Sequence, residues 1–187
     1  AMVLGWAAPL LPIQLLWVNL VTDSLPAIAL GMEPAEENIM ERPPRKNTDS
    51  LFGDGLGGRI LLEGVMIGVL ALLAFGIGHV YFDQENGYAV GRTMAFAVLS
   101  LSQLVHAFNM RGEGSLGKLP FCSNKWLLMA FVVGVALQCV VIMMPPLAGI
   151  FQVVPLNGEQ WLLTAALALA PLPLVELEKA VWHPKQK

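Results

Sequence analysis

Three oxygen-bearing side chains, Asn19, Thr22 and Asp23, interrupt an otherwise apolar stretch near the start of the chain. Asn19 and Asp23 are four residues apart and share one face of a helix, and Thr22 lies on the flank of that face. Carboxylate, amide and hydroxyl oxygens suit a hard cation such as calcium or magnesium, and no soft ligand accompanies them. The spacing therefore predicts an oxygen-lined cation site.

The apolar surroundings make Asp23 a functional candidate. An aspartate at the centre of a membrane helix costs about 2.5–3.5 kcal/mol, so we expect another group to pair with it. Pro26 cannot donate a backbone amide, which frees main-chain oxygens one turn earlier, as in the broken helices that line ion sites in transporters. The alternative is that these polar groups only hold helices together. For Asn19 alone, helix contact and ion binding are equally good explanations. The Asp23 carboxylate favours ion binding.

Composition indicates the fold class. Hydrophobic residues make up 56% of the chain and charged residues 13%, against about 25% charged in soluble domains. Five apolar stretches are each close to the roughly 17–25 residues that cross a bilayer. The predicted fold is an all-α integral membrane bundle of about five transmembrane helices within residues 1–187. The spans are residues 10–30, 60–82, 93–109, 126–144 and 161–177, with a long cytoplasmic loop at 31–58.

Lysine and arginine predict the orientation of the bundle. All but Arg92 lie in the loops after the first and third spans or after the fifth span, so those loops and the C-terminus are predicted to be cytoplasmic. The net charge of −3 is small and gives no support to nucleic-acid binding. The first span follows the first residues with no charged region ahead of it, which predicts a piece of a larger protein.

Other polar residues lie within the second and third spans. Glu63 is four residues after Arg59, which favours an ion pair between them over a role in a transport path. Gln103, His106 and Asn109 share one face of the third span. Gln103 is near the middle of that span and can offer a neutral oxygen to an ion. Gly64 and Gly68 form a GxxxG step, which permits close helix packing.

A long segment resembles a known family. Residues 12–27, PIQLLWVNLVTDSLPA, are followed by ALG at 29–31 and IMERPPR at 39–45. Together they resemble the sixth transmembrane helix and following loop of P-type calcium-transporting ATPases, closest to the sarcoplasmic and endoplasmic reticulum type and its bacterial relatives. The remaining spans fit helices seven to ten of that family by order, length and orientation. The resemblance implies the C-terminal membrane region of an ATP-driven calcium pump in a bacterial plasma membrane.

The resemblance also implies roles for individual residues. Asn19, Thr22 and Asp23 match calcium ligands of the sixth helix, and Gln103 falls where pumps with two sites carry a glutamate. A neutral amide weakens that site, since ligand charge sets much of the affinity for calcium, so one calcium per cycle is expected. ATP and magnesium belong to cytoplasmic domains that this chain lacks, so the chain alone has no catalytic site. Its expected partners are calcium, the bilayer, and the other helices and cytoplasmic domains of the pump.

Three alternatives remain open. A pump of the same family can move another cation, such as manganese or sodium, because oxygen ligands alone do not separate these ions. A secondary cation exchanger would use the same carboxylate without ATP and predicts an inverted repeat of residues 19–26, which the sequence does not contain. A purely structural membrane subunit would tolerate the substitution Asp23→Asn.

Overall fold

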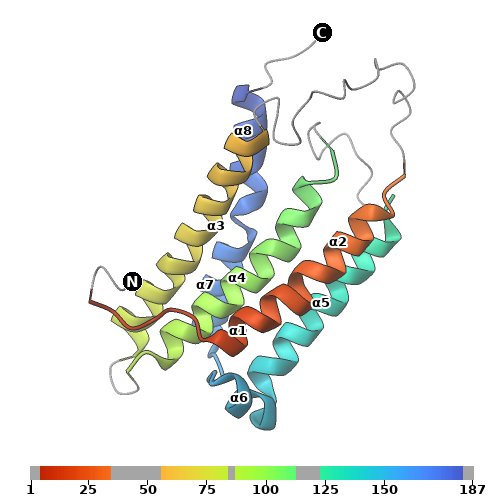
Figure 1. Ribbon diagram of the computed structural model, residues 1–187. Helices are drawn as coiled ribbons and strands as arrows, with labels where there is room; N and C mark the ends of the chain where they lie inside the picture. The colour runs from red at the N-terminus through yellow and green to blue at the C-terminus, as the bar shows by residue number, and fades with distance from the viewer. Residues whose placement is uncertain (1–4, 35–55, 84–86, 113–122, 183–187) are drawn as a thin grey trace, which may run out of the picture.

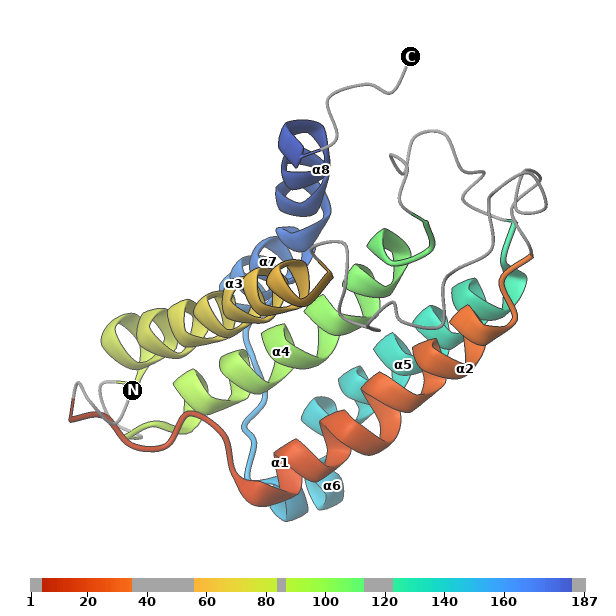
Figure 2. The same ribbon diagram turned by 45° about the horizontal axis from the view of Figure 1, so that its top comes forward.

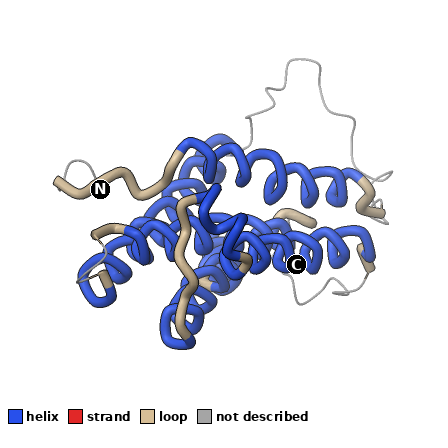
Figure 3. Tube along the Cα trace, turned by 90° about the horizontal axis from the view of Figure 1, so that it is seen from below, coloured by secondary structure: helices blue, strands red, loops and turns tan. Residues whose placement is uncertain are grey.

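The computed structural model describes residues 5–34, 56–83, 87–112 and 123–182, and within these ranges every regular element is a helix (Figure 3). The all-α fold predicted from composition is therefore confirmed. The first span comprises α1 (Pro12–Trp17), the π-helical turn η2 (Val18–Asp23) and α2 (Ser24–Gly31). The other elements are α3 (Leu56–Ile77), η4 (Gly78–Phe82), α4 (Ala89–Asn109), α5 (Lys125–Met143), α6 (Pro145–Phe151), α7 (Gly158–Leu169) and α8 (Pro171–Trp182).

Helix α4 lies at the centre of the bundle. It runs between α3 and the pair formed by α2 and α5 (Figures 1 and 2), and it also contacts α7 and α8. Met94, Phe96 and Leu104 are fully buried on it, and so are the hydroxyl-bearing Ser100 and Ser102. The central position explains its composition, because protein surrounds this helix and polar side chains there do not face lipid.

Four helical stretches of the described chain are long and apolar enough to cross a membrane, and their bounds are Pro12–Gly31, Leu56–Phe82, Lys125–Met143 and Gly158–Lys179. Helix α4 is not among them, although its 21 residues correspond to about 31 Å of helix. It coincides with the third predicted span, which has the most polar interruptions. The count of five spans stays a prediction.

The last predicted span is bent. The sequence pattern placed one uninterrupted span at 161–177, whereas the structure has two helices, α7 and α8, that meet at Pro171. Proline has no amide to continue the helical ladder, and its ring clashes with the carbonyl one turn earlier. The two helices consequently run in different directions (Figure 2).

Short polar residues begin several helices. The carboxylate of Asp83 accepts the backbone amides of Val90 and Gly91 at 2.9 and 2.8 Å, at the first turn of α4. Asn124 accepts the amide of Leu127 at 2.9 Å and begins α5. Such side chains satisfy amides that have no partner within their own helix, so they fix where each helix starts.

Two glycines allow α4 to approach the turn after α3. A Cβ atom on Gly78 would lie 2.5 Å from the Cα atom of Gly91, so no side chain fits between the two backbones. The predicted step at Gly64 and Gly68 behaves differently, because a Cβ on either residue would meet no described atom within 4 Å. Close packing at that step is not found among the described residues.

Basic residues mark one end of the bundle. Arg59 lies in the first turn of α3, Lys125 begins α5, and Arg111 follows α4. The end of α2, the end of α4 and the whole of α8 lie at this same end, while α6 lies at the opposite end (Figure 1). Most of the predicted loop at 31–58 lies outside the described residues.

Candidate cation site

The predicted ligands lie on a π-helical turn in the middle of the first span. Residues Val18–Asp23 are wound more widely than the α-helices on either side, and this turn contains Asn19, Thr22 and Asp23. Pro26 lies in the first turn of α2 and cannot donate to the carbonyl of Thr22, which is its partner in a regular α-helix. The span is therefore locally widened, and the helix continues past the proline. Single π-helical turns occur frequently at functional sites.

Side-chain hydroxyls take up some of the backbone groups at this turn. The hydroxyl of Ser24 donates to the carbonyl of Asn19 at 3.1 Å, across five residues. The hydroxyl of Thr22 donates to the carbonyl of Val18 at 2.8 Å. Both bonds bring side-chain donors to carbonyls of the π-helical turn, and neither reaches the carbonyl of Thr22, whose usual donor Pro26 removes.

Thr22 faces the central helix. It is 1% exposed, and its Oγ atom lies 3.4 Å from the Oε1 atom of Gln103 on α4. The structure thus brings together two of the four residues predicted from the sequence, although 81 positions separate them. A hydroxyl and an amide oxygen at this separation can both contribute to the coordination of a hard cation.

Asn19 and Asp23 lie on the exposed side of the same turn. Neither side chain makes a hydrogen bond or ion pair with the described part of the chain, so the partner expected for Asp23 is not found there. No group of three or more His, Cys, Asp or Glu residues that could hold a metal occurs among the described residues either. The candidate ligands are one carboxylate, one hydroxyl and one amide on the turn, with the amide of Gln103 on α4. These oxygens suit calcium better than a softer metal.

Amide side chains fix the N-terminal half of the first span. The indole Nε1 of Trp17 donates to Gln138 Oε1 on α5 at 2.9 Å, so Gln138 joins two helices. The fully buried Gln14 donates from Nε2 to the carbonyl of Phe151 at 3.0 Å. The sequence analysis did not predict that Gln14 makes a helix contact. The signal that could have indicated it is an amide close to Pro12, at the beginning of an apolar span.

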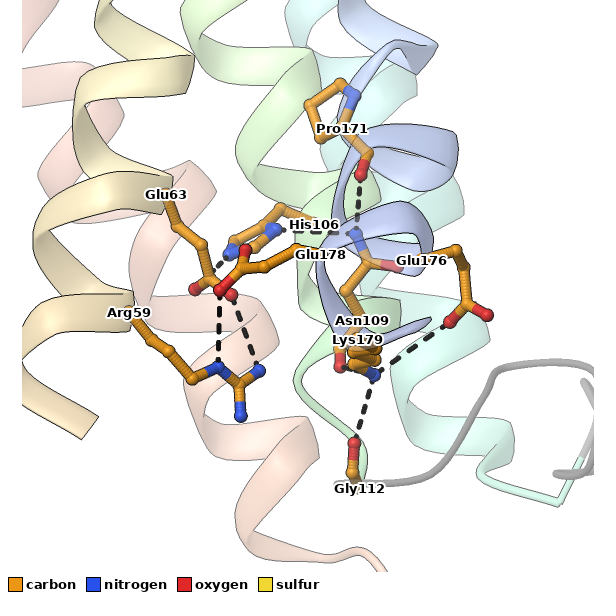
Figure 4. A network of polar contacts seen from close by, with 9 residues as sticks. All are labelled: Arg59, Glu63, His106, Asn109, Gly112, Pro171, Glu176, Glu178 and Lys179. Carbon is orange, nitrogen blue, oxygen red and sulfur yellow. Dashed lines mark hydrogen bonds and ion pairs between the residues drawn. The ribbon is translucent and has the colours of Figure 1, made fainter. Parts of the chain in front are cut away.

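A second polar cluster joins α3, α4 and α8, as Figure 4 shows. Glu63 is 4% exposed. Its carboxylate lies 3.5 Å from Arg59 Nη2 and 3.3 Å from His106 Nε2. The predicted Arg59–Glu63 pair is confirmed, whereas the partner on α4 was not predicted.

Helix α8 completes this cluster. Glu178 Oε1 lies 3.6 Å from Arg59 Nε. Lys179 donates from Nζ to the carbonyls of Asn109 and Gly112 at 2.9 and 3.1 Å. Because these contacts satisfy charged groups next to three helix ends, the cluster is best explained as an anchor for α8.

Comparison with known proteins identifies the family. The sequence model described as cation transporting ATPase, C-terminus, matches residues 7–181. Calcium-transporting ATPase 1 of Bacillus cereus is 39% identical over 193 aligned residues, which cover 96% of this chain and 22% of that protein.

Two further relatives have similar coverage. The calcium-transporting ATPase of Bacillus subtilis is 42% identical over 172 residues, which cover 91% of this chain and 19% of that protein. The endoplasmic reticulum-type calcium-transporting ATPase 4 of Arabidopsis thaliana is 29% identical over 231 residues, 95% of this chain and 22% of that protein. The chain thus spans about a fifth of the length of the curated relatives it matches. With a family match over nearly its whole length and an all-helical membrane bundle, the chain belongs to the cation transporting ATPase C-terminal family.

Proposed function

We propose that this chain is the membrane part of an ATP-driven calcium pump and that its first span supplies ligands to the transport site. Three named relatives are calcium-transporting ATPases. The oxygen donors at the π-helical turn agree with that ion, since calcium takes carboxylate, amide, hydroxyl and backbone oxygens. The nucleotide-binding and phosphorylation chemistry, with its ATP and magnesium, belongs to cytoplasmic domains outside this chain.

The observation that carries the proposal is the contact between the π-helical turn and α4. Thr22 Oγ and Gln103 Oε1 lie 3.4 Å apart, so two neutral oxygens face one another across two helices. Asp23 supplies the negative charge, and Asn19 supplies a further amide oxygen. Their exposed side is where helices from elsewhere in the pump contribute the remaining ligands. With an amide at position 103, the site has one carboxylate fewer, and we propose one calcium per cycle.

The transport cycle follows from the chemistry of Asp23. A carboxylate that binds calcium can accept a proton after the ion leaves, so Asp23 serves as ligand and as proton carrier. The loop at 31–58 directly follows the ligand-bearing span and couples its movement to the phosphorylation domain. In this arrangement the C-terminus is cytoplasmic, and the pump is in the plasma membrane of a bacterium.

The substitution Asp23→Asn in the full-length pump tests the proposal. It keeps the size of the side chain and removes the charge, so we expect the calcium concentration for half-maximal ATP hydrolysis to rise by roughly ten-fold or more. ATP hydrolysis by purified wild type and variant is measured with calcium, manganese, sodium and potassium. Glu159→Gln, on an exposed carboxylate at the start of α7, is the matched control and is expected to leave the calcium response unchanged.

Each result has a defined meaning. Activation by calcium that is lost in Asp23→Asn and retained in Glu159→Gln supports both the ion and the residue. Activation of the wild type by another ion alone contradicts the calcium assignment. Unchanged calcium activation in Asp23→Asn contradicts the assignment of this site.

A further inference from the structure

An ion pair lies directly beyond the end of the ligand-bearing span. Glu33 follows α2 by two residues, and Arg111 follows α4 by two residues. Arg111 Nε lies 3.1 and 3.2 Å from the two oxygens of Glu33, and Nη2 lies 2.7 Å from Oε1. The Arg111 side chain is 1% exposed and that of Glu33 19%. Forked, charge-assisted contacts of this kind fix the orientation of both partners as well as their distance.

Asn124 joins the same pair to α5. Its Nδ2 atom donates to the carbonyl of Ala29 at 2.9 Å and to Glu33 Oε2 at 2.6 Å. Its Oδ1 atom accepts the amide of Leu127, which begins α5. The side chain is buried. Asn124 therefore contacts a carbonyl in the last turn of α2, the carboxylate of Glu33 and the first turn of α5.

The electrostatics of Glu33 agree with this geometry. Burial is the largest single influence and by itself raises the pKa of the Glu33 carboxyl. Hydrogen bonds from Arg111 and Asn124, together with the charge of Arg111, outweigh burial and hold this pKa below its ordinary value. The carboxylate is thus ionised in the folded protein at neutral pH.

We propose that Glu33, Arg111 and Asn124 form a clamp that positions the ligand-bearing span against α4 and α5. The inference rests on the proposed function, because it assigns the clamp a role in the affinity of the calcium site. Thr22 lies eleven residues before Glu33, and Gln103 lies eight residues before Arg111. Because each helical residue adds about 1.5 Å, the clamp and the Thr22–Gln103 contact lie well apart along the helices. Two contacts at separate points fix the angle between the same two spans.

The apolar packing next to the clamp supplies few directional contacts. Ala29, Ala107 and Ala130 form much of the cluster between α2, α4 and α5, together with Phe108 and Leu127. Small side chains permit close approach but make few directional contacts, so they do little to set the position of this end of α2 along its axis. The directed bonds of the clamp supply that position. Its three members are positioning residues that act through Thr22.

The test uses the full-length pump and separates calcium affinity from maximal rate. In Glu33→Gln and in Asn124→Ala, we expect the calcium concentration for half-maximal ATP hydrolysis to rise by about five-fold or more, as for other couplings between distant sites. The maximal rate at saturating calcium is expected to stay within about two-fold, since the ligands themselves remain. Glu159→Gln serves again as the matched control.

Unchanged calcium affinity in both single variants would overturn the clamp. If Glu33→Gln does not accumulate as folded protein, Glu33→Asp decides the question, because a shortened carboxylate must shift the affinity in the same direction. A wild type without calcium activation contradicts the proposed function itself, whereas a calcium-activated wild type with unaffected clamp variants contradicts only the clamp.

Discussion

At the scale of single residues, mutual contact and exposure divide the four candidate ligands into two pairs. Thr22 and Gln103 are neutral and contact each other across two helices. Asn19 and Asp23 are exposed on the same turn, and Asp23 carries the only charge of the set. A hard cation gains most from a charged ligand, so the two pairs are expected to contribute unequally to affinity.

The substitution Gln103→Glu tests this inequality. It adds a carboxylate beside Thr22, and we expect the full-length pump to bind calcium more tightly, by roughly three-fold or more, since ligand charge tunes calcium affinity strongly. Equilibrium binding of radioactive calcium to membranes measures the effect. Gln152→Glu makes the same chemical change at an exposed residue beyond α6 and is expected to change nothing. Equal calcium affinity in Gln103→Glu and wild type would contradict the assignment of Gln103.

At the scale of elements, the turn η4 and the start of α4 meet through their backbones, without side chains between them. Gly78 and Gly91 let the turn η4 meet the first residues of α4 at van der Waals distance. Asp83 binds the amides of Val90 and Gly91 at the same place. The crossing point and the start of α4 are therefore set together.

Gly78→Ala is expected to destabilise the protein by about 1–3 kcal/mol, because the added methyl group has no room beside Gly91. Gly64→Ala is the matched control in the same long helical stretch. A Cβ there meets no described atom within 4 Å, and alanine is the better helix former. Thermal unfolding of the purified full-length pump in detergent compares the two. A loss of stability as large in Gly64→Ala as in Gly78→Ala would contradict the crossing point.

At the scale of the whole molecule, the ion pairs of the described residues lie at one end of the bundle. The clamp joins the end of α2 to α4 and α5, and the cluster around Glu63 joins α3 and α4 to α8 (Figure 4). Between the helices, apolar clusters supply most of the packing. Charged contacts at a helix end cost less than at the bilayer centre, because headgroups and water are near.

Acid is expected to weaken the whole bundle through Glu33. Its carboxyl has a lower pKa in the folded protein than in the unfolded chain, so it stabilises the fold above the unfolded pKa. This stabilisation is lost as the pH falls through the folded pKa. Glu33→Gln should accordingly lower stability by about 2 kcal/mol at neutral pH and by progressively less in acid.

Thermal unfolding of both proteins over a range of pH measures this difference. Lys and Arg charges do not change over the acid range, and Asn124 is uncharged, so Glu33 is the titrating member of the clamp. Glu159→Gln, with its exposed carboxylate, is expected to show a small difference at every pH. A difference between wild type and Glu33→Gln that stays constant down to strongly acid pH would exclude this role for Glu33.

The sequence by itself determined the class of the protein and its local features. Hydropathy over about twenty residues indicates membrane helices regardless of which helix is next to which. The Arg59–Glu63 pair was predictable because four residues make one helical turn. The family could be inferred from residues 12–45, and the family match over residues 7–181 confirms it.

Only the tertiary structure decided which distant residues meet. Thr22 and Gln103 are 81 positions apart, and Glu33 and Arg111 are 78 apart. Helical periodicity gives the face on which a residue lies, but it does not give the neighbour, the depth or the crossing point of that face. The π-helical turn was also beyond the sequence pattern, because Pro26 indicates a disturbed ladder without indicating how the backbone resolves it. Helix packing decides which residues meet, since it fixes the contacts that local propensity leaves open.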